Sequence, residues 1–114
     1  MKINKLLLSA ITATTLMSTA ACAFDAEKVF VRDCQGCHGP KHQGGVGADI
    51  RPAALKKKNS QDLASTILNG RPGTAMPAWK KGESIGYEFT KADANKMVDY
   101  LQHFKGLKSQ VLTL

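Results

Sequence analysis

The sequence contains no internal repeats and no low-complexity tract, and patterns typical of β-strands are scarce along its 114 residues. A chain of this length has room for one small domain, and the weak strand signal favours an all-α fold. Acidic residues are also few, with 9 Asp and Glu against 16 Lys and Arg. A basic chain of this kind can bind nucleic acid, an anionic membrane or an acidic protein.

Cysteine is rare as well, and the three cysteines do not have the arrangement of common structural sites. Only two residues separate Cys34 from Cys37, so a disulfide between them would close no useful loop. A second close pair that would complete a zinc site is absent. A thioredoxin-like redox pair belongs near a βαβ pattern, which is also missing. The sequence offers no catalytic base or second metal site, so we do not expect an enzyme.

No apolar run clearly reaches the roughly 20 residues that a transmembrane helix needs. The main run, residues 6–17, is rich in Thr, follows two lysines and precedes an Ala-Cys-Ala sequence. This layout is typical of a secretory signal peptide. We predict cleavage after Ala23, which removes residues 1–23 and leaves residues 24–114 as one domain in the periplasm. The alternatives are lipidation of Cys22 and retention of the segment as an anchor. Export argues against a nucleic-acid partner.

Four stretches carry helical signals with caps at their ends. The first is a helix that Asp25 caps and that ends at about Cys34, and the second is a short helix over 52–57. The third begins after Ser60 as N-cap and ends at Gly70. The last begins at Thr90, which forms a capping box with Asp93, and ends at Gly106. Stretches rich in glycine and proline separate them and predict long loops.

Residues 34–38 read Cys-Gln-Gly-Cys-His, which is the C-x-x-C-H signature of haem c attachment. Two thiols one turn apart can form thioethers with the two vinyl groups on one edge of a porphyrin. The imidazole that follows them can then reach the iron from one side of the ring. We therefore predict one covalently bound haem c, attached through Cys34 and Cys37, with His38 as an axial ligand of the iron.

Haems that transfer electrons usually carry Met or His as a second axial ligand. The candidates are Met76, Met97, His42 and His103. His42 is too close to His38 in sequence to reach round the haem edge, and Met97 fits the apolar stripe of the last helix. Met76 stands in a Gly-Thr-Ala-Met-Pro loop about forty residues downstream of His38, where the proline stiffens the backbone. We predict Met76 as the sixth ligand; the alternative is a buried loop methionine.

These features resemble class I cytochromes c over nearly the whole of residues 24–114. The shared features are an aromatic-bearing first helix, C-x-x-C-H, a distal Met-Pro loop and a C-terminal helix. The resemblance implies a small all-α fold of about three to five helices wrapped around one covalent haem. It also implies that the first and last helices cross, with Phe30 and either Tyr100 or Leu101 in contact.

Within this family the sequence is similar to the c55X cytochromes. The similarity rests on the runs Arg-Asp-Cys-Gln-Gly-Cys-His-Gly, Gly-Gly-Val-Gly and Ile-Leu-Asn-Gly-Arg-Pro-Gly-Thr-Ala-Met-Pro-Ala-Trp. Those small periplasmic proteins are encoded beside cytochrome cd1 nitrite reductase in denitrifying bacteria. The resemblance therefore implies a role in denitrification.

Three further residues are candidates for the surroundings of the haem, Trp79 and Ala48 from the resemblance and Arg71 from the chemistry of its side chain. The indole N–H of Trp79 would bind a haem propionate, or the ring would form a partly buried lid. Arg71 would pair with a propionate, or remain solvated. The carbonyl of Ala48, where family members often carry proline, would accept a hydrogen bond from His38 Nδ1–H. The segment 82–89 is longer than the usual link to the last helix, and nothing in the sequence predicts its role.

Together these observations predict a monomeric carrier of single electrons with one haem. The expected partner is a redox protein. It is either cytochrome cd1 nitrite reductase, to which this protein would donate electrons or in whose maturation it would take part, or another respiratory complex. One alternative is a generic electron donor to a terminal oxidase or dehydrogenase. Another is a haem enzyme or gas sensor with an open iron site, which requires that Met76 does not ligate. The basic runs 56–58 and 80–81 would steer the protein to an acidic partner, or form a solvated face.

Overall fold

The computed structural model describes residues 23–84 and 86–106 of the chain. Within these ranges every regular element is helical, and the single β feature is an isolated bridge between Lys80 and Phe89. The predicted all-α fold is therefore confirmed. The predicted signal peptide, apart from its last residue, lies outside the described residues. In the described part of the chain, no helix is long and apolar enough to cross a membrane.

The first helical stretch continues through the attachment motif. It consists of α1 (Ala26–Val29), a π-helical segment (Phe30–Cys34) and α2 (Gln35–His38). Asp25 is its N-cap, as predicted, and accepts a hydrogen bond from the Lys28 backbone N–H at 3.2 Å. The predicted end near Cys34 is wrong. A wider π turn, closed by the Gln35 N–H on the Phe30 carbonyl, carries the helix on to His38.

Two helices follow the glycine-rich loop: α3 (Pro52–Leu55) and α4 (Ser60–Asn69). The predicted cap of α4 is wrong by one residue, because Asn59 holds the N-cap position and accepts from the Gln61 N–H at 2.7 Å. The Ser60 hydroxyl instead donates to Gln102 at 3.2 Å, and this links the start of α4 to the end of the last helix. Gly70 ends α4, as predicted.

The last helix, α5 (Lys91–Gln102), begins with the predicted capping box between Thr90 and Asp93. It ends earlier than predicted, at His103 rather than Gly106. The His103 ring bonds the Asp99 carbonyl at 2.8 Å, which caps the end of the helix. Phe104 leaves the helix and stacks on His42, with ring centroids 3.5 Å apart.

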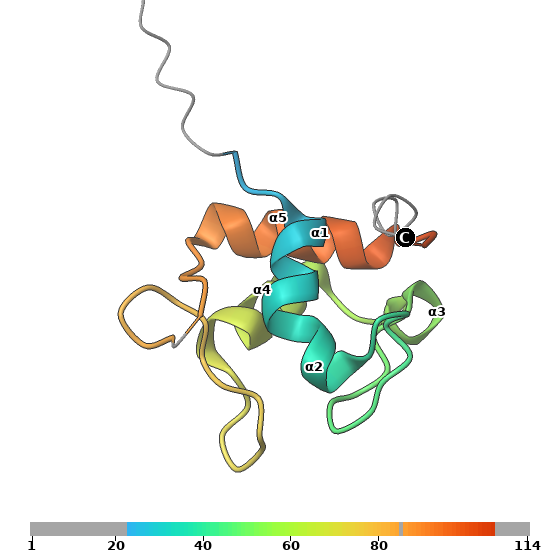
Figure 1. Cartoon of the computed structure of the whole chain (residues 1–114), viewed down its shortest axis with the longest axis horizontal. Helices are drawn as coiled ribbons and strands as arrows, with labels where there is room; N and C mark the ends of the chain where they lie inside the picture. Colours follow the sequence, from blue (N-terminus) through green and yellow to red (C-terminus); the bar gives the residue numbers. More distant parts are fainter. Residues whose placement is uncertain (1–22, 85, 107–114) are drawn as a thin grey trace, which may run out of the picture.

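The core forms where α1 and α4 pack against α5 (Figure 1). Phe30 is fully buried, and its ring centroid lies 6.1 Å from that of Tyr100, as expected for crossing first and last helices. Met97, with 1% of its surface exposed, belongs to the same core. Figure 1 also shows that the loops after α2 and α4 extend away from α5, on the opposite side of the molecule.

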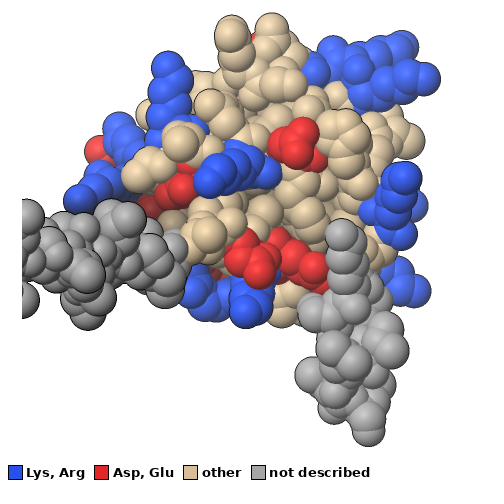
Figure 2. Space-filling view, turned by 90° about the horizontal axis from the view of Figure 1, so that it is seen from above, with Lys and Arg blue, Asp and Glu red and all other residues tan. Residues whose placement is uncertain are grey.

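The surface charge is mixed on the face shown in Figure 2. Lys and Arg side chains lie around the edge of this face and also near its middle, and Asp and Glu side chains lie among them. Lys80 also pairs with Glu83 at 3.2 Å, with both side chains largely exposed. Such exposed pairs contribute little to stability.

Candidate haem site

A cavity of about 370 Å³ opens between the first helix, the two long loops and the core. Its wall is mostly apolar, with contributions from α4 and α5. All six residues that the sequence predicted for the site line it: Cys34, Cys37, His38, Arg71, Met76 and Trp79. Met97 also lines the cavity, whereas neither His42 nor His103 is among its lining residues. Residues more than forty positions apart in the chain thus converge on one space.

The orientation of His38 follows from one hydrogen bond. Its Nδ1 lies 2.8 Å from the carbonyl oxygen of Ala48, as the resemblance implied. A carbonyl can only accept, so Nδ1 carries the proton and donates it. In the neutral imidazole the other ring nitrogen, Nε2, then carries no proton and is the atom that can bind a metal.

Backbone hydrogen bonds hold the Ala48 carbonyl in place. The N–H of Gly44 donates to the His38 carbonyl at 2.7 Å, and the N–H of Gly47 donates to the Cys37 carbonyl at 2.8 Å. A Cβ atom at Gly47 would lie 2.9 Å from the His38 ring. Glycine at this position therefore lets the loop approach the imidazole closely enough for the bond to form.

The Met76 loop is tied to the end of α4. Gly70 has φ of 67°, and a Cβ atom there would lie 2.6 Å from the Met76 carbonyl oxygen. The Arg71 N–H donates to that carbonyl at 3.2 Å. Beyond the loop, the backbone N–H of Trp79 donates to the Ile67 carbonyl at 3.1 Å. These contacts fix both ends of the loop while Met76 lines the cavity.

The two cysteines of the attachment motif lie in different surroundings. Cys37 is exposed and Cys34 is partly buried. Burial, and secondly the nearby charges of Asp33 and Cys37, raise the pKa of the Cys34 thiol to about 12. The Cys34 thiol is therefore harder to deprotonate than an ordinary cysteine.

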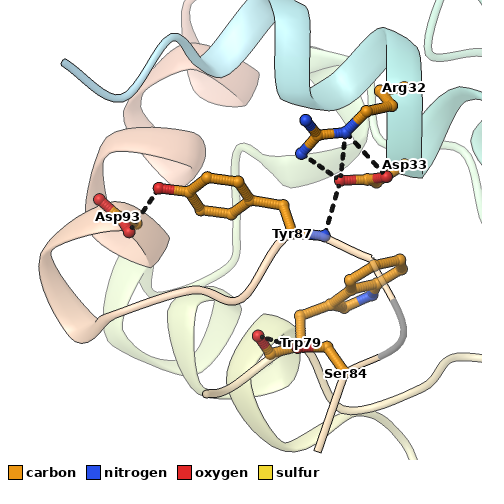
Figure 3. A network of polar contacts seen from close by, with 6 residues as sticks. All are labelled: Arg32, Asp33, Trp79, Ser84, Tyr87 and Asp93. Carbon is orange, nitrogen blue, oxygen red and sulfur yellow. Dashed lines mark hydrogen bonds and ion pairs between the residues drawn. The ribbon is translucent and has the colours of Figure 1, made fainter. Parts of the chain in front are cut away.

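The segment 82–89, for which the sequence predicted no role, belongs to the structure around the site. The Phe89 N–H donates to the Trp79 carbonyl at 2.7 Å, and Phe89 is 1% exposed. The Tyr87 N–H donates to the Asp33 carboxylate at 3.1 Å, as Figure 3 shows. Sequence reasoning did not single out Asp33 or Tyr87. The one signal for Asp33 was its position directly before the attachment motif.

His42 was considered in the sequence only as an unsuitable ligand, and it is in fact a core residue. It has no exposed surface and a φ of 63°. Its ring lies between Phe104 and Phe30, whose centroids are 3.5 Å and 3.9 Å away. Its Nε2 is 3.5 Å from the Tyr100 hydroxyl, and its Nδ1 is buried without a hydrogen-bond partner in the described part of the chain.

The donor set fits haem c: two thiols one turn apart, an imidazole with a free Nε2 and a thioether line one mostly apolar cavity. A helical domain with this site is a c-type cytochrome. In agreement, the family model described as "Cytochrome C oxidase, cbb3-type, subunit III" matches residues 23–101, and the chain belongs to this family of cytochrome c domains. Its cofactor is covalently bound haem c.

One named cytochrome and two solved structures are similar to this chain. The chain is 43% identical over 70 residues to cytochrome c55X of Paracoccus denitrificans (strain Pd 1222), a match that covers 61% of this chain and 62% of that protein. A solved structure of the c-type cytochrome NirC is similar with a TM-score of 0.60 at 35% identity, over 68% of this chain and 84% of that one. The solved structure of the dihydro-heme d1 dehydrogenase NirN in complex with DHE is similar with a TM-score of 0.59 at 30% identity, over 68% of this chain and 15% of that one.

Proposed function

We propose that this protein is a periplasmic electron carrier whose haem iron cycles between Fe(II) and Fe(III) without binding a substrate. Cys34 and Cys37 would hold the haem through thioethers, and His38 Nε2 and the Met76 sulfur would be the axial ligands. The hydrogen bond from His38 Nδ1 to Ala48 carries the proposal, because it leaves Nε2 free for the iron. A thioether ligand favours ferrous iron and raises the reduction potential.

Arg71 and Trp79 are proposed to bind the haem propionates. Both line the cavity, and neither side chain has a hydrogen-bond or ion-pair partner among the described residues. A guanidinium group and an indole N–H are donors that suit a carboxylate.

Optical spectra of two matched variants test the axial ligand. Met76 and Met97 both line the cavity, so Met76→Leu and Met97→Leu remove one thioether each at nearly constant volume. We expect Met76→Leu to abolish the weak charge-transfer band of methionine-ligated ferric haem and to make the ferrous protein bind carbon monoxide. Met97→Leu should have neither effect. A wild-type protein that lacks this band and binds carbon monoxide readily would instead indicate a haem enzyme or gas sensor.

We further propose that the protein serves denitrification, as electron donor to cytochrome cd1 nitrite reductase or in the maturation of its d1 haem. The similarity to a cytochrome c55X and to a dihydro-heme d1 dehydrogenase supports this role. Stopped-flow mixing of the reduced protein with the reductase should show faster electron transfer than an unrelated class I cytochrome c gives. Equal rates would favour the generic electron donor.

The periplasmic location depends on the proposed signal peptide, residues 1–23. Expression of the full chain in a bacterium that attaches haem c should yield a periplasmic holoprotein. Its mass should correspond to a chain that begins at Phe24 and carries one haem. A product that retains residues 1–23, or that carries lipid on Cys22, would contradict the proposal.

A further inference from the structure

Two carboxylates, Asp33 and Asp49, line the wall of the haem cavity. The Asp49 side chain is 36% exposed and pairs with Arg51 at 2.6 Å, so Asp33 is the more buried of the two. Asp33 directly precedes Cys34 and lines the cavity. Its side chain is only 9% exposed. A negative charge that is largely removed from water acts on its neighbours through a lower dielectric than a surface charge does.

The Asp33 carboxylate has two sets of donors. Arg32 contacts it with Nε at 3.1 Å and Nη2 at 2.8 Å from Oδ2. The Tyr87 backbone N–H, from the other end of the chain, donates to the same oxygen at 3.1 Å (Figure 3). The Arg32 side chain is 58% exposed, so water screens the guanidinium much more than it screens the carboxylate.

The segment that supplies the Tyr87 N–H is itself held in place. The Tyr87 hydroxyl lies 3.1 Å from Asp93, the capping-box residue of α5. The Ser84 hydroxyl donates to the Trp79 carbonyl at 2.9 Å. At Gly86 a Cβ atom would lie 2.6 Å from the Trp79 ring and 3.0 Å from Asp33 Oδ1. Gly86 and Tyr87 therefore lie directly against the carboxylate.

We propose that Asp33, held by Arg32 and by the Tyr87 N–H, is a fixed negative charge that lowers the reduction potential of the haem. The inference rests on the proposed function as an electron carrier. A nearby negative charge stabilises Fe(III), which carries one more positive charge than Fe(II). The long segment 82–89 then has a role, because it positions this charge and limits its access to water.

Redox titration of the holoprotein, followed by its optical spectrum, tests the inference. At a fixed ambient potential, Asp33→Asn should raise the ratio of ferrous to ferric protein about three- to tenfold; tenfold corresponds to about 59 mV for one electron. Asn retains an oxygen that can accept from the Tyr87 N–H. The control Asp99→Asn makes the same charge change on α5 at a side chain that is 79% exposed, and should change the ratio less than about twofold.

A second variant separates charge from a loss of local structure. Arg32→Gln leaves the carboxylate uncompensated, so it should shift the ratio in the opposite direction, by a smaller factor. Loosening of the segment would move both variants in the same direction, and that result would overturn the inference. If Asp33→Asn does not accumulate with haem, the direction of the Arg32→Gln shift decides.

The outcomes also distinguish this inference from the proposed function. A wild-type protein without a reversible one-electron couple would refute the electron carrier itself. A reversible couple in Asp33→Asn whose ferrous-to-ferric ratio, at the same ambient potential, stays within about twofold of the wild-type ratio would refute only the role of Asp33.

Discussion

The buried imidazole of His42 should make the stability of this protein depend on pH in a defined direction. Burial, and secondly the proximity of His38, lower the pKa of His42 from 6.5 to about 4. Between these two values the unfolded chain binds a proton at His42 and the folded protein does not. The free energy of unfolding therefore falls as the pH falls through this window, and the effect is absent above it.

The magnitude follows from the two pKa values. Between about pH 8 and about pH 5, His42 should reduce the free energy of unfolding by about 2 kcal/mol. The environment explains the size: the ring has no exposed surface, lies between Phe30 and Phe104, and has only a long contact to Tyr100 for its Nε2. A charged imidazole there would be a buried cation without an acidic partner.

The matched variant is His42→Phe, which keeps an aromatic ring between Phe30 and Phe104 but cannot titrate. Urea unfolding of both holoproteins, followed by far-UV circular dichroism at several pH values, gives the two pH dependences. Because all other titratable groups are the same in both proteins, the difference in slope isolates His42. The variant should have the flatter slope even if it is less stable at neutral pH. Equal slopes between about pH 6.5 and pH 5 would refute the reasoning.

Three further predictions concern stability, each measured by urea unfolding of the holoprotein. Gly70→Ala should lower the free energy of unfolding by more than about 1 kcal/mol, because φ is 67° and the new Cβ would meet the Met76 carbonyl. The control Gly73→Ala has φ of 80° but open space around the new Cβ, so its loss of stability should be smaller. Equal losses in the two variants would contradict the steric argument. Asn59→Ala should cost about 1 kcal/mol through loss of the α4 cap, and a cost near zero would contradict that assignment. Phe30→Ala, at a fully buried side chain, should cost about 3–5 kcal/mol, and less than about 1 kcal/mol would show that Phe30 is not central to the core.

Local features of the fold were predictable because they depend on neighbouring residues. Asp25 and Thr90 cap their helices as expected, since a cap needs only a side-chain oxygen and the next turn of backbone. The same logic failed at Asn59 and Ser60, where two adjacent residues can both cap. The choice between them involves Gln102, which bonds Ser60 from the far end of the chain.

The helix ends were less predictable than the starts. The sequence suggested Gly106 as the end of α5, because glycine commonly follows a helix. The helix ends at His103 instead, and Phe104 packs on His42. That contact joins residues more than sixty positions apart, so no local pattern indicates it.

The sequence by itself indicated the cofactor, because Cys34, Cys37 and His38 have the short fixed spacing of the C-x-x-C-H signature of haem c attachment. It also indicated Met76 as a candidate ligand, because this methionine lies in a loop about forty residues downstream of His38, beside a proline that stiffens the backbone. Only the tertiary structure decided what surrounds these groups. It buried His42 and left His38 facing the cavity, although these two histidines are only four positions apart in the chain. It also brought Tyr87 to Asp33 across 54 positions, because burial and electrostatic environment arise where distant segments pack together.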